Sequence, residues 1–297
     1  MKDYFAEYGY TPDKEATGRA LDLIAANLEN VVTKPVLLSC FSMMDLTTLK
    51  TDDTVTSVRR LVEKVNDFQK EYPDYPLPAS ICVYPDFVET VKACKTCGQV
   101  NITAVAGCFP SSQSFIEVKL LECAMAVEKG ADEIDIVLSL NSFLDGDYES
   151  ASDEIRQIRS CIDAKAAEQG RTVHLKVILE TGLLMSPDLI AKASFLAMEA
   201  GADFIKTSTG KVSVNATPAA AYTMCECIAA YYRKTGRKVG FKPAGGISSA
   251  LDAVSYYTIV STVLGEEWLD KSLFRFGVSR MANNIISSIE QKTVAYF

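Results

Sequence analysis

The 297-residue chain contains a single histidine, His174, and this scarcity limits the chemistry that it can perform. Histidine-rich metal centres are excluded, and a Ser-His-Asp triad would have to use His174. In residues 172–180, "TVHLKVILE", His174 alternates with the inward-facing residues of a predicted strand. We therefore expect it to be a structural or outward-facing residue.

Long apolar runs and basic tracts are also missing. No apolar segment approaches the roughly 18 residues that a membrane-spanning helix needs. Thirty Lys and Arg residues against 38 Asp and Glu residues give a net charge of −8, which no basic tract offsets. The first residues, "MKDYFAEYGYTPDKEA", lack the apolar core of an export signal. We expect a cytoplasmic protein that binds neither nucleic acid nor membrane, although clustered lysines could bind a small anion.

Cysteine is more abundant, but its spacing does not favour a metal site. Nine cysteines, an odd number scattered through apolar segments, fit a reducing compartment and core packing. The pairs Cys94–Cys97 and Cys225–Cys227 lack the further ligands at known spacings that zinc would need. A Cys-x-x-Cys redox pair at Cys94 and Cys97 is an alternative that the surrounding sequence does not favour.

Eight short β-like runs alternate with amphipathic helical stretches along the chain. The runs lie at residues 42–46, 79–84, 100–107, 132–138, 173–180, 203–208, 238–244 and 272–278. The helical stretches include residues 54–72, 114–130, 154–170 and 186–201. This alternation without a linker predicts an α/β protein with a (β/α)8 TIM barrel over residues 41–297, an open doubly wound sheet being the alternative. Residues 1–40 precede the first strand, and we expect them to form an N-terminal helical extension.

An internal near-repeat connects two of the predicted strands. Gly130 and Gly201 each begin a Gly-Ala-Asp turn between a helix and a strand, and they stand 71 residues apart. Asp135 and Lys206 each follow the aspartate of their turn by three residues. If the two segments are strands four and six of a barrel, both side chains point into the same interior layer. An unpaired carboxylate would be costly there, so we expect Asp135 and Lys206 to be partners.

Two further lysines, Lys176 and Lys242, lie in the predicted fifth and seventh strands. A single lysine at a strand end ordinarily extends to solvent. Ionisable residues on four consecutive strands instead favour a functional cluster. Desolvation and neighbouring ammonium groups lower the pKa of a lysine, and a neutral lysine can form a Schiff base with a carbonyl.

Glycine-containing turns after the seventh and eighth strands are candidates for phosphate binding. The "TGK" at 209–211 does not complete a Walker A motif, because Ile205 stands where the first glycine is required and Val212 follows the lysine. Residues 243–248, "PAGGIS", and 275–281, "RFGVSRM", fit better. Adjacent glycines allow close backbone approach, a helix is expected to begin at the last serine of "PAGGIS", and barrels often bind phosphate with these two loops. Two ordinary turns are the alternative.

Several motifs occur in a fixed order along most of the chain. They are "MMDLTTL", "CVYP", "GADEIDIV", "LKVILETG", "GADFIKTSTGKVSVNATP", "GFKPAGG" and "RFGVS". In this order they resemble the deoxyribose-phosphate aldolase family of class I, Schiff-base aldolases. The resemblance implies a (β/α)8 barrel without metal or other cofactor. It also implies a lyase of deoxyribonucleotide catabolism that reversibly cleaves 2-deoxy-D-ribose 5-phosphate to D-glyceraldehyde 3-phosphate and acetaldehyde.

The resemblance also implies roles for individual residues. The Schiff-base lysine falls on Lys206, the lysine that perturbs it on Lys242, and the proton-relay aspartate on Asp135. Positions that line the family's substrate pocket fall on Asp45, Cys82, Lys176, Thr209 and Lys211. The phosphate cradle falls on Gly245, Gly246, Gly277 and Ser279. Two departures are Arg280, which replaces a serine, and Tyr296, which is penultimate where some members end in a catalytic tyrosine.

A phosphorylated sugar is thus the expected partner, and the sequence leaves a homodimer open. Three other functions are alternatives: a transaldolase-like Schiff-base aldolase with ketone substrates, a metal-dependent aldolase, and an inactive barrel that serves as a scaffold. The single histidine argues against the second of these. The presence of every charged position that the chemistry needs argues against the third.

Overall fold

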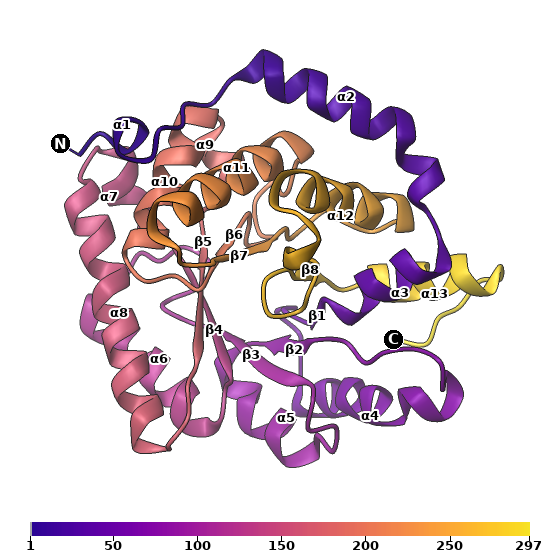
Figure 1. Ribbon diagram of the computed structural model, residues 1–297. Coiled ribbons are helices and arrows are strands. Elements are labelled where there is room, and N and C mark those ends of the chain that lie inside the picture. The colour runs from indigo at the N-terminus through magenta and orange to yellow at the C-terminus, as the bar shows by residue number, and fades with distance from the viewer. Residues whose placement is uncertain (1) are drawn as a thin grey trace.

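The computed structural model describes residues 2–297, and its centre is a barrel of eight parallel strands (Figure 1). The strands are β1 Met44–Thr47, β2 Ser80–Val83, β3 Asn101–Val105, β4 Glu133–Val137, β5 His174–Ile178, β6 Phe204–Lys206, β7 Gly240–Lys242 and β8 Phe276–Val278. Neighbours pair in chain order, β1 also pairs with β8, and the bridges Phe241–Phe274 and Ala244–Gly277 bring the two ends of the sheet together. The predicted (β/α)8 barrel is confirmed.

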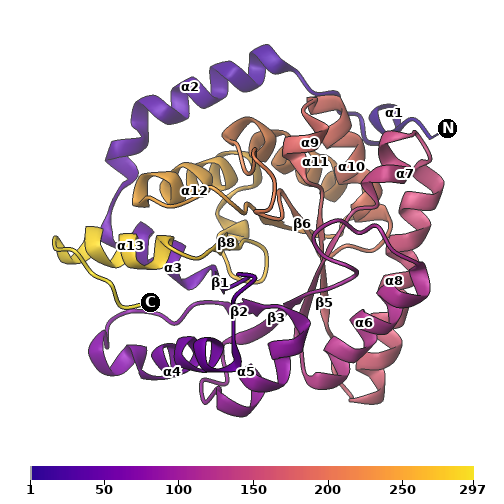
Figure 2. The ribbon, with the colours of Figure 1, turned by 180° about the vertical axis from the view of Figure 1, so that it is seen from behind.

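Helices surround the barrel and alternate with its strands (Figures 1 and 2). In the first half of the chain they are α1 Tyr4–Tyr8, α2 Lys14–Val31, α3 Lys34–Ser42, α4 Val55–Glu71, η1 Pro85–Phe87, α5 Val88–Cys94, α6 Ile116–Lys129, α7 Leu140–Leu144 and α8 Tyr148–Glu168. The others are α9 Thr181–Leu184, α10 Pro187–Glu199, α11 Pro218–Thr235, α12 Ala250–Leu264, η2 Glu266–Trp268 and α13 Met281–Glu290. Local sequence explains their ends: Thr217 caps α11 by accepting a hydrogen bond from the Ala220 amide, and Gly130 ends α6 with a φ of 115°.

From residue 2 to the start of β1, the chain forms three helices. Helix α2 lies across the outside of α11 and α12, as both ribbon views show (Figures 1 and 2). Helix α1 packs on α10, where the ring of Tyr8 stacks on Phe195 with centroids 4.4 Å apart and its hydroxyl donates to Glu199 over 2.5 Å. Helix α3 runs across position 40, so the boundary expected there falls inside a helix.

Four observations concern a membrane-spanning helix, a metal site, the cysteine pair and His174. Within residues 2–297, no helix combines the length and apolar character that crossing a bilayer requires. The same residues contain no group of three or more His, Cys, Asp or Glu side chains arranged to hold a metal. Cys94 and Cys97 are free thiols. His174 is exposed at the start of β5, which confirms its expected outward position.

Candidate active site

The barrel interior holds a cluster of charged side chains that extends to the carboxyl ends of β6 and β7. The cluster consists of Asp45 on β1, Glu133 and Asp135 on β4, Lys176 on β5, Lys206 on β6, Lys242 on β7 and Arg275 just before β8. All of these side chains are buried. The strand register brings them together, since Asp135 is level with Lys176 and Lys206 is level with Lys242. Period-two alternation points the strand residues of the cluster inward.

Asp135 is the centre of this cluster. One carboxylate oxygen, Oδ2, accepts from Nζ of Lys206 over 2.8 Å and from Nζ of Lys242 over 2.7 Å. The other, Oδ1, accepts from Nζ of Lys176 over 2.9 Å. Burial alone would disfavour the carboxylate, but the three ammonium groups outweigh it and hold the pKa of Asp135 well below its usual range. The hydrogen bond between Lys206 and Asp135 confirms the expectation that these two residues are partners.

The cluster carries one more positive group than negative ones. Its cations are Lys176, Lys206, Lys242 and Arg275, and its carboxylates are Asp45, Glu133 and Asp135. Loss of a single proton from one ammonium group would make the buried cluster neutral, and burial strongly favours neutrality. The balance thus explains how one lysine in this barrel can be uncharged.

Lys206 is the lysine that is best placed to lose that proton. Burial lowers its pKa, the Lys242 ammonium acts in the same direction, and Asp135 opposes them only in part. Burial also acts on Lys242, but its two carboxylate partners, Asp135 and Asp45, outweigh it and raise the pKa of Lys242. Carboxylates raise the pKa of Lys176 in the same way. Among the three lysines of the cluster, Lys206 is therefore the one whose neutral form is favoured.

A cavity of about 270 Å³ opens above Lys206 at the carboxyl end of the barrel. Residues 47–50, 209–211, 244–246 and 277–279 form the rest of its wall. Every residue of the charged cluster lies within the described part of the chain, and Lys206 is the only one of them that lines this cavity. The nucleophile expected from the sequence is thus also the one cluster member that a substrate can reach.

Three residues expected to line the pocket lie below it instead. Asp45, Cys82 and Lys176 are fully buried and do not belong to the cavity wall. The Asp45 carboxylate is held by Lys242 at 2.5 Å, and Nζ of Lys176 donates to Glu133 at 2.5 Å. Asp45 and Lys176 therefore form ion pairs with the charged residues around Lys206 from within the barrel. Burial raises the pKa of the Cys82 thiol, which keeps that group neutral.

The residues expected to cradle a phosphate all lie in the cavity wall. Gly245 and Gly246 have φ values of 78° and 77°, which residues other than glycine rarely adopt. A Cβ atom on Gly277 would lie 2.7 Å from Cβ of Ala244, so the two loops meet without room for a side chain. Gly277 and Ser279 complete this part of the wall.

The helix after "PAGGIS" begins later than the sequence suggested. Helix α12 starts at Ala250 rather than at Ser248, and Ser249 is its N-cap residue. The backbone amides of Ser248 and Ser249 donate to Oδ2 of Asp252 at 3.1 Å and 2.9 Å. Because the helix uses these amides for its own capping box, the glycine loops are the better candidates for phosphate binding.

Thr209 and Lys211, both expected in the pocket, do line the cavity. The Thr209 hydroxyl and amide donate to the Glu180 carboxylate at 2.5 Å and 3.1 Å. Nζ of Lys211 donates to the carbonyl of Leu49, which ties two loops of the cavity together. Lys50 adds a second exposed ammonium group to the wall, and nothing in the sequence pattern had singled it out.

Three residues that the structure places in or beside the site were not foreseen: Glu133, Glu180 and Arg275. Arg275 donates to Asp45 at 2.6 Å and to Glu133 at 2.6 Å, and so closes the charged cluster from below. Glu133 could have been found, because it stands two residues before Asp135 and strand alternation puts both on one face. Glu180 and Arg275 lie inside the matching motifs, but outside the strands themselves, where no periodicity indicates their direction.

The lowered pKa of Lys206 gives a test of the neighbouring ammonium group. In a Lys242→Leu variant, Lys206 loses a repelling positive charge, so its pKa rises. A nucleophile must be deprotonated, and activity therefore increases as pH rises through that pKa. We expect the acid limb of the kcat/KM profile to move to higher pH. An acid limb that stays in place, measured in a variant with an unchanged circular dichroism spectrum, would contradict this role.

The C-terminal residues are docked away from the cavity. The Tyr296 hydroxyl donates to the carbonyl of Lys64 on α4 at 2.8 Å, and its ring packs edge-on against Phe68 at 5.3 Å. The backbone amides of Tyr296 and Phe297 both donate to Oδ1 of Asn283 at 2.9 Å. These contacts give the two aromatic residues a structural place between α4 and α13.

Deletion of Tyr296 and Phe297 should therefore lower stability and leave turnover unchanged. The loss of two partly buried aromatic side chains should cost roughly 1–3 kcal/mol of unfolding free energy. Urea unfolding measures that loss, and kcat is measured on the same preparation. A large fall in kcat at unchanged stability would instead show that the tail leaves this position to act at the cavity.

Comparisons with known proteins agree with the geometry. The family model described as DeoC/LacD family aldolase matches residues 40–256. The deoxyribose-phosphate aldolase of Homo sapiens is 43% identical over 260 residues, which cover 84% of this chain and 79% of that protein. The enzyme of Bos taurus is 42% identical over the same shares of both chains.

Solved structures agree in fold. Deoxyribose phosphate aldolase from Aeropyrum pernix, described as a unique tetramer, matches with a TM-score of 0.67 and 23% identity, covering 94% of this chain and 99% of that one. The aldolase QR15 matches with a TM-score of 0.66 and 24% identity, covering 84% and 96%. From the extent of the family match and the identity to these relatives, the chain belongs to the DeoC/LacD aldolase family.

Proposed function

We propose that the protein is a metal-independent class I aldolase that reversibly cleaves 2-deoxy-D-ribose 5-phosphate to D-glyceraldehyde 3-phosphate and acetaldehyde. The observation that carries the proposal is Lys206, whose pKa is lowered and which alone among the cluster lysines reaches the cavity. Relatives named deoxyribose-phosphate aldolase at 42–43% identity support the choice of reaction.

The first step is covalent. Neutral Lys206 adds to the C1 aldehyde of the open-chain sugar, and loss of water leaves a protonated imine on Nζ. The positive imine nitrogen is Nζ of Lys206, which lies 2.8 Å from Oδ2 of Asp135, so the carboxylate stabilises it. The imine is the electron sink for the next step.

The second step breaks the C2–C3 bond. The C3 hydroxyl loses its proton to the Asp135 carboxylate, through a water that Asp135 and the Lys242 ammonium group hold, and the electron pair of the C2–C3 bond moves into the imine. This forms the aldehyde of D-glyceraldehyde 3-phosphate and leaves an enamine on Lys206. Protonation of the enamine at its terminal carbon and hydrolysis of the imine release acetaldehyde and restore the neutral lysine. Each positioned proton transfer contributes about 10²–10⁴-fold to the rate.

The cavity wall suits a phosphorylated substrate. Gly245, Gly246 and Gly277 expose backbone at the mouth, with Ser279 beside them. The ammonium groups of Lys50 and Lys211 lie in the same wall and complement a phosphate dianion. We infer that the phosphate binds here, while the aldehyde end of the sugar extends down to Lys206. We infer also that the protein works in the cytoplasm.

Cleavage of 2-deoxy-D-ribose 5-phosphate, followed in EDTA through release of acetaldehyde, tests this proposal. Full activity in EDTA is the expected result, and activity that disappears with the chelator would point to a metal-dependent aldolase. Use of a ketone donor in preference to acetaldehyde in the reverse direction would point to a transaldolase-like enzyme. The related tetramer leaves the assembly to be measured, and sedimentation would distinguish a homodimer from a tetramer.

A further inference from the structure

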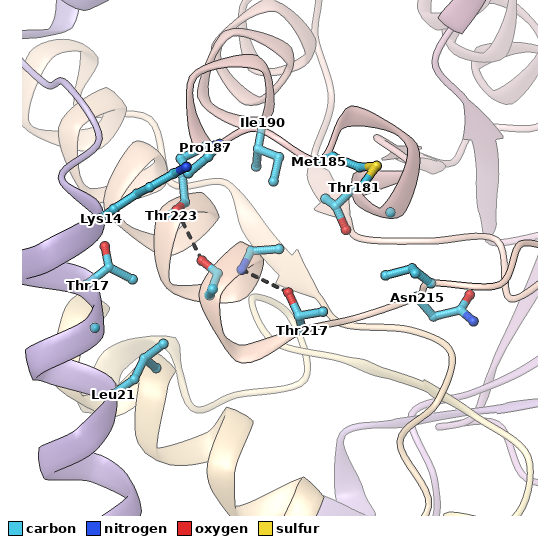
Figure 3. A pocket seen from close by; sticks show the side chains of 15 residues that line it. Lys14, Thr17, Leu21, Thr181, Met185, Pro187, Ile190, Asn215, Thr217 and Thr223 are labelled. Atoms are coloured by element: carbon cyan, nitrogen blue, oxygen red, sulfur yellow. Dashed lines mark hydrogen bonds between the residues drawn. The ribbon is translucent and has the colours of Figure 1, made fainter.

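A second cavity, of about 470 Å³, lies between the N-terminal extension and the barrel. Helix α2 forms one side of it, with Lys14, Thr17 and Leu21 facing the opening in Figure 3. The opposite side comes from Thr181 on α9 and Ile190 on α10. Its volume falls within the range of pockets that hold small organic ligands.

The wall of this cavity contains a buried hydroxyl without a partner. Thr181 is only 3% exposed, and its Oγ1 has no hydrogen-bond partner anywhere in residues 2–297. Buried hydroxyls in folded proteins are almost always paired, so an orphan beside a cavity marks a place for a ligand group. In Figure 3 the Thr181 hydroxyl points toward the open space. A ligand hydroxyl or carbonyl would satisfy it.

The surface of the remaining wall is mostly apolar, although it includes threonines and Asn215, and a cation lies at one end. Met185 and Val214 are 82% and 46% exposed, so large apolar surface at the rim faces water. Leu21 and Ile190 continue this surface inside. Lys14 extends from α2 across the cavity toward α10 (Figure 3), and it forms no ion pair with any described residue. The lining is therefore complementary to a negative charge at one end and to a hydrocarbon along its length.

We propose that this cavity binds a small amphipathic acid with an aliphatic chain and a hydroxyl at its far end. Its carboxylate pairs with Lys14, its chain covers Leu21, Ile190 and Met185, and its hydroxyl bonds to Oγ1 of Thr181. The site depends on α2 for one wall, which gives a purpose to the N-terminal extension that we propose for residues 1–40. Nothing in the proposed catalytic mechanism uses these residues, so the site is separate from that function.

The cavity nevertheless borders the catalytic site at two points. Thr181 directly follows Glu180, whose carboxylate holds Thr209 in the catalytic cavity. The side chain of Asn215, another wall residue, fills the space beside Gly245, where an added Cβ would lie 2.7 Å from it. A ligand in this cavity would therefore lie beside Thr181, which adjoins Glu180 in sequence, and beside Asn215, which packs against Gly245 of the phosphate cradle.

Isothermal titration calorimetry on the full chain tests the site without reference to catalysis. The probes are 8-hydroxyoctanoate, octanoate, which lacks the terminal hydroxyl, and 1-octanol, which lacks the charge. We expect 8-hydroxyoctanoate to bind most tightly. Loss of the hydroxyl contact should weaken binding roughly two- to tenfold, and loss of the exposed ion pair roughly two- to fivefold. No measurable binding of any probe would overturn the proposal.

Variants locate the binding. Thr17→Phe, which projects a ring from α2 into the cavity, should abolish binding of all three probes. Lys14→Ala should weaken the two acids roughly two- to fivefold and leave 1-octanol unchanged. Arg19→Ala is the matched control, because Arg19 lies on the same helix outside the cavity and, among residues 2–297, pairs with Glu15 alone. Binding of all three probes that is unchanged in both cavity variants would place the probes elsewhere and refute the site.

Discussion

Lys206→Ala is expected to lower kcat/KM for cleavage of 2-deoxy-D-ribose 5-phosphate by at least about 10⁴-fold, the scale on which loss of a covalent nucleophile falls. Lys176 and Lys242 cannot replace it, since both are fully buried, carry raised pKa values and do not reach the cavity. The variant should fold, because it removes the excess positive charge from the cluster and leaves Asp135 with two ammonium partners.

Borohydride trapping identifies the nucleophile directly. Wild-type protein incubated with substrate and borohydride should carry a reduced adduct on the peptide that contains Lys206, and the alanine variant should carry none. Lys119→Met is the matched control, because Lys119 is also buried and ion-paired, to Glu154 at 2.8 Å, but lies on α6 outside the cavity. That variant should still be trapped. An inactivated wild-type protein with an unmodified Lys206 peptide would refute the Schiff base.

The fold was predictable because each strand is a short apolar run between helices with clear periodicity. Errors arose mainly at strand ends. The run expected at 203–208 is a strand only over Phe204–Lys206, since the chain then turns: the Thr207 amide donates to the carbonyl of Lys242, and Thr209 is drawn toward Glu180. Residues with high β propensity can thus belong to the loops that carry a site, and propensity alone does not show where the loop begins.

The site was predictable to the extent that it follows strand alternation. Asp135 and Lys206 could be paired from their equivalent positions after two Gly-Ala-Asp turns, because alternate strands share a layer. The depth of Asp45 and Lys176 could not be predicted, because depth depends on the stagger of neighbouring strands, which no single strand encodes. Arg275 precedes its strand, and only the closed barrel shows that its guanidinium reaches Glu133.

Asp135→Asn is expected to separate Schiff-base formation from bond cleavage. Asparagine is close in size to aspartate but cannot accept the proton of the C3 hydroxyl, so kcat should fall about 10²–10⁴-fold. Lys206 also loses the carboxylate that raises its pKa. The pKa of Lys206 therefore falls further, which favours its neutral, nucleophilic form. Borohydride should still trap an adduct on Lys206 in this variant, whereas Lys206→Ala prevents trapping altogether.

The same substitution should also destabilise the fold, because the buried cluster loses the carboxylate that three lysines share. Removal of one partner from a buried ion network costs roughly 3–5 kcal/mol, which urea unfolding would detect. Glu133→Gln is the matched control, since Glu133 lies on the same strand and pairs with Lys176 and Arg275 but not with Lys206. It should lower stability by a similar amount with a much smaller effect on kcat. Equal losses of kcat in the two variants would mean that Asp135 supports the barrel and does not relay the proton.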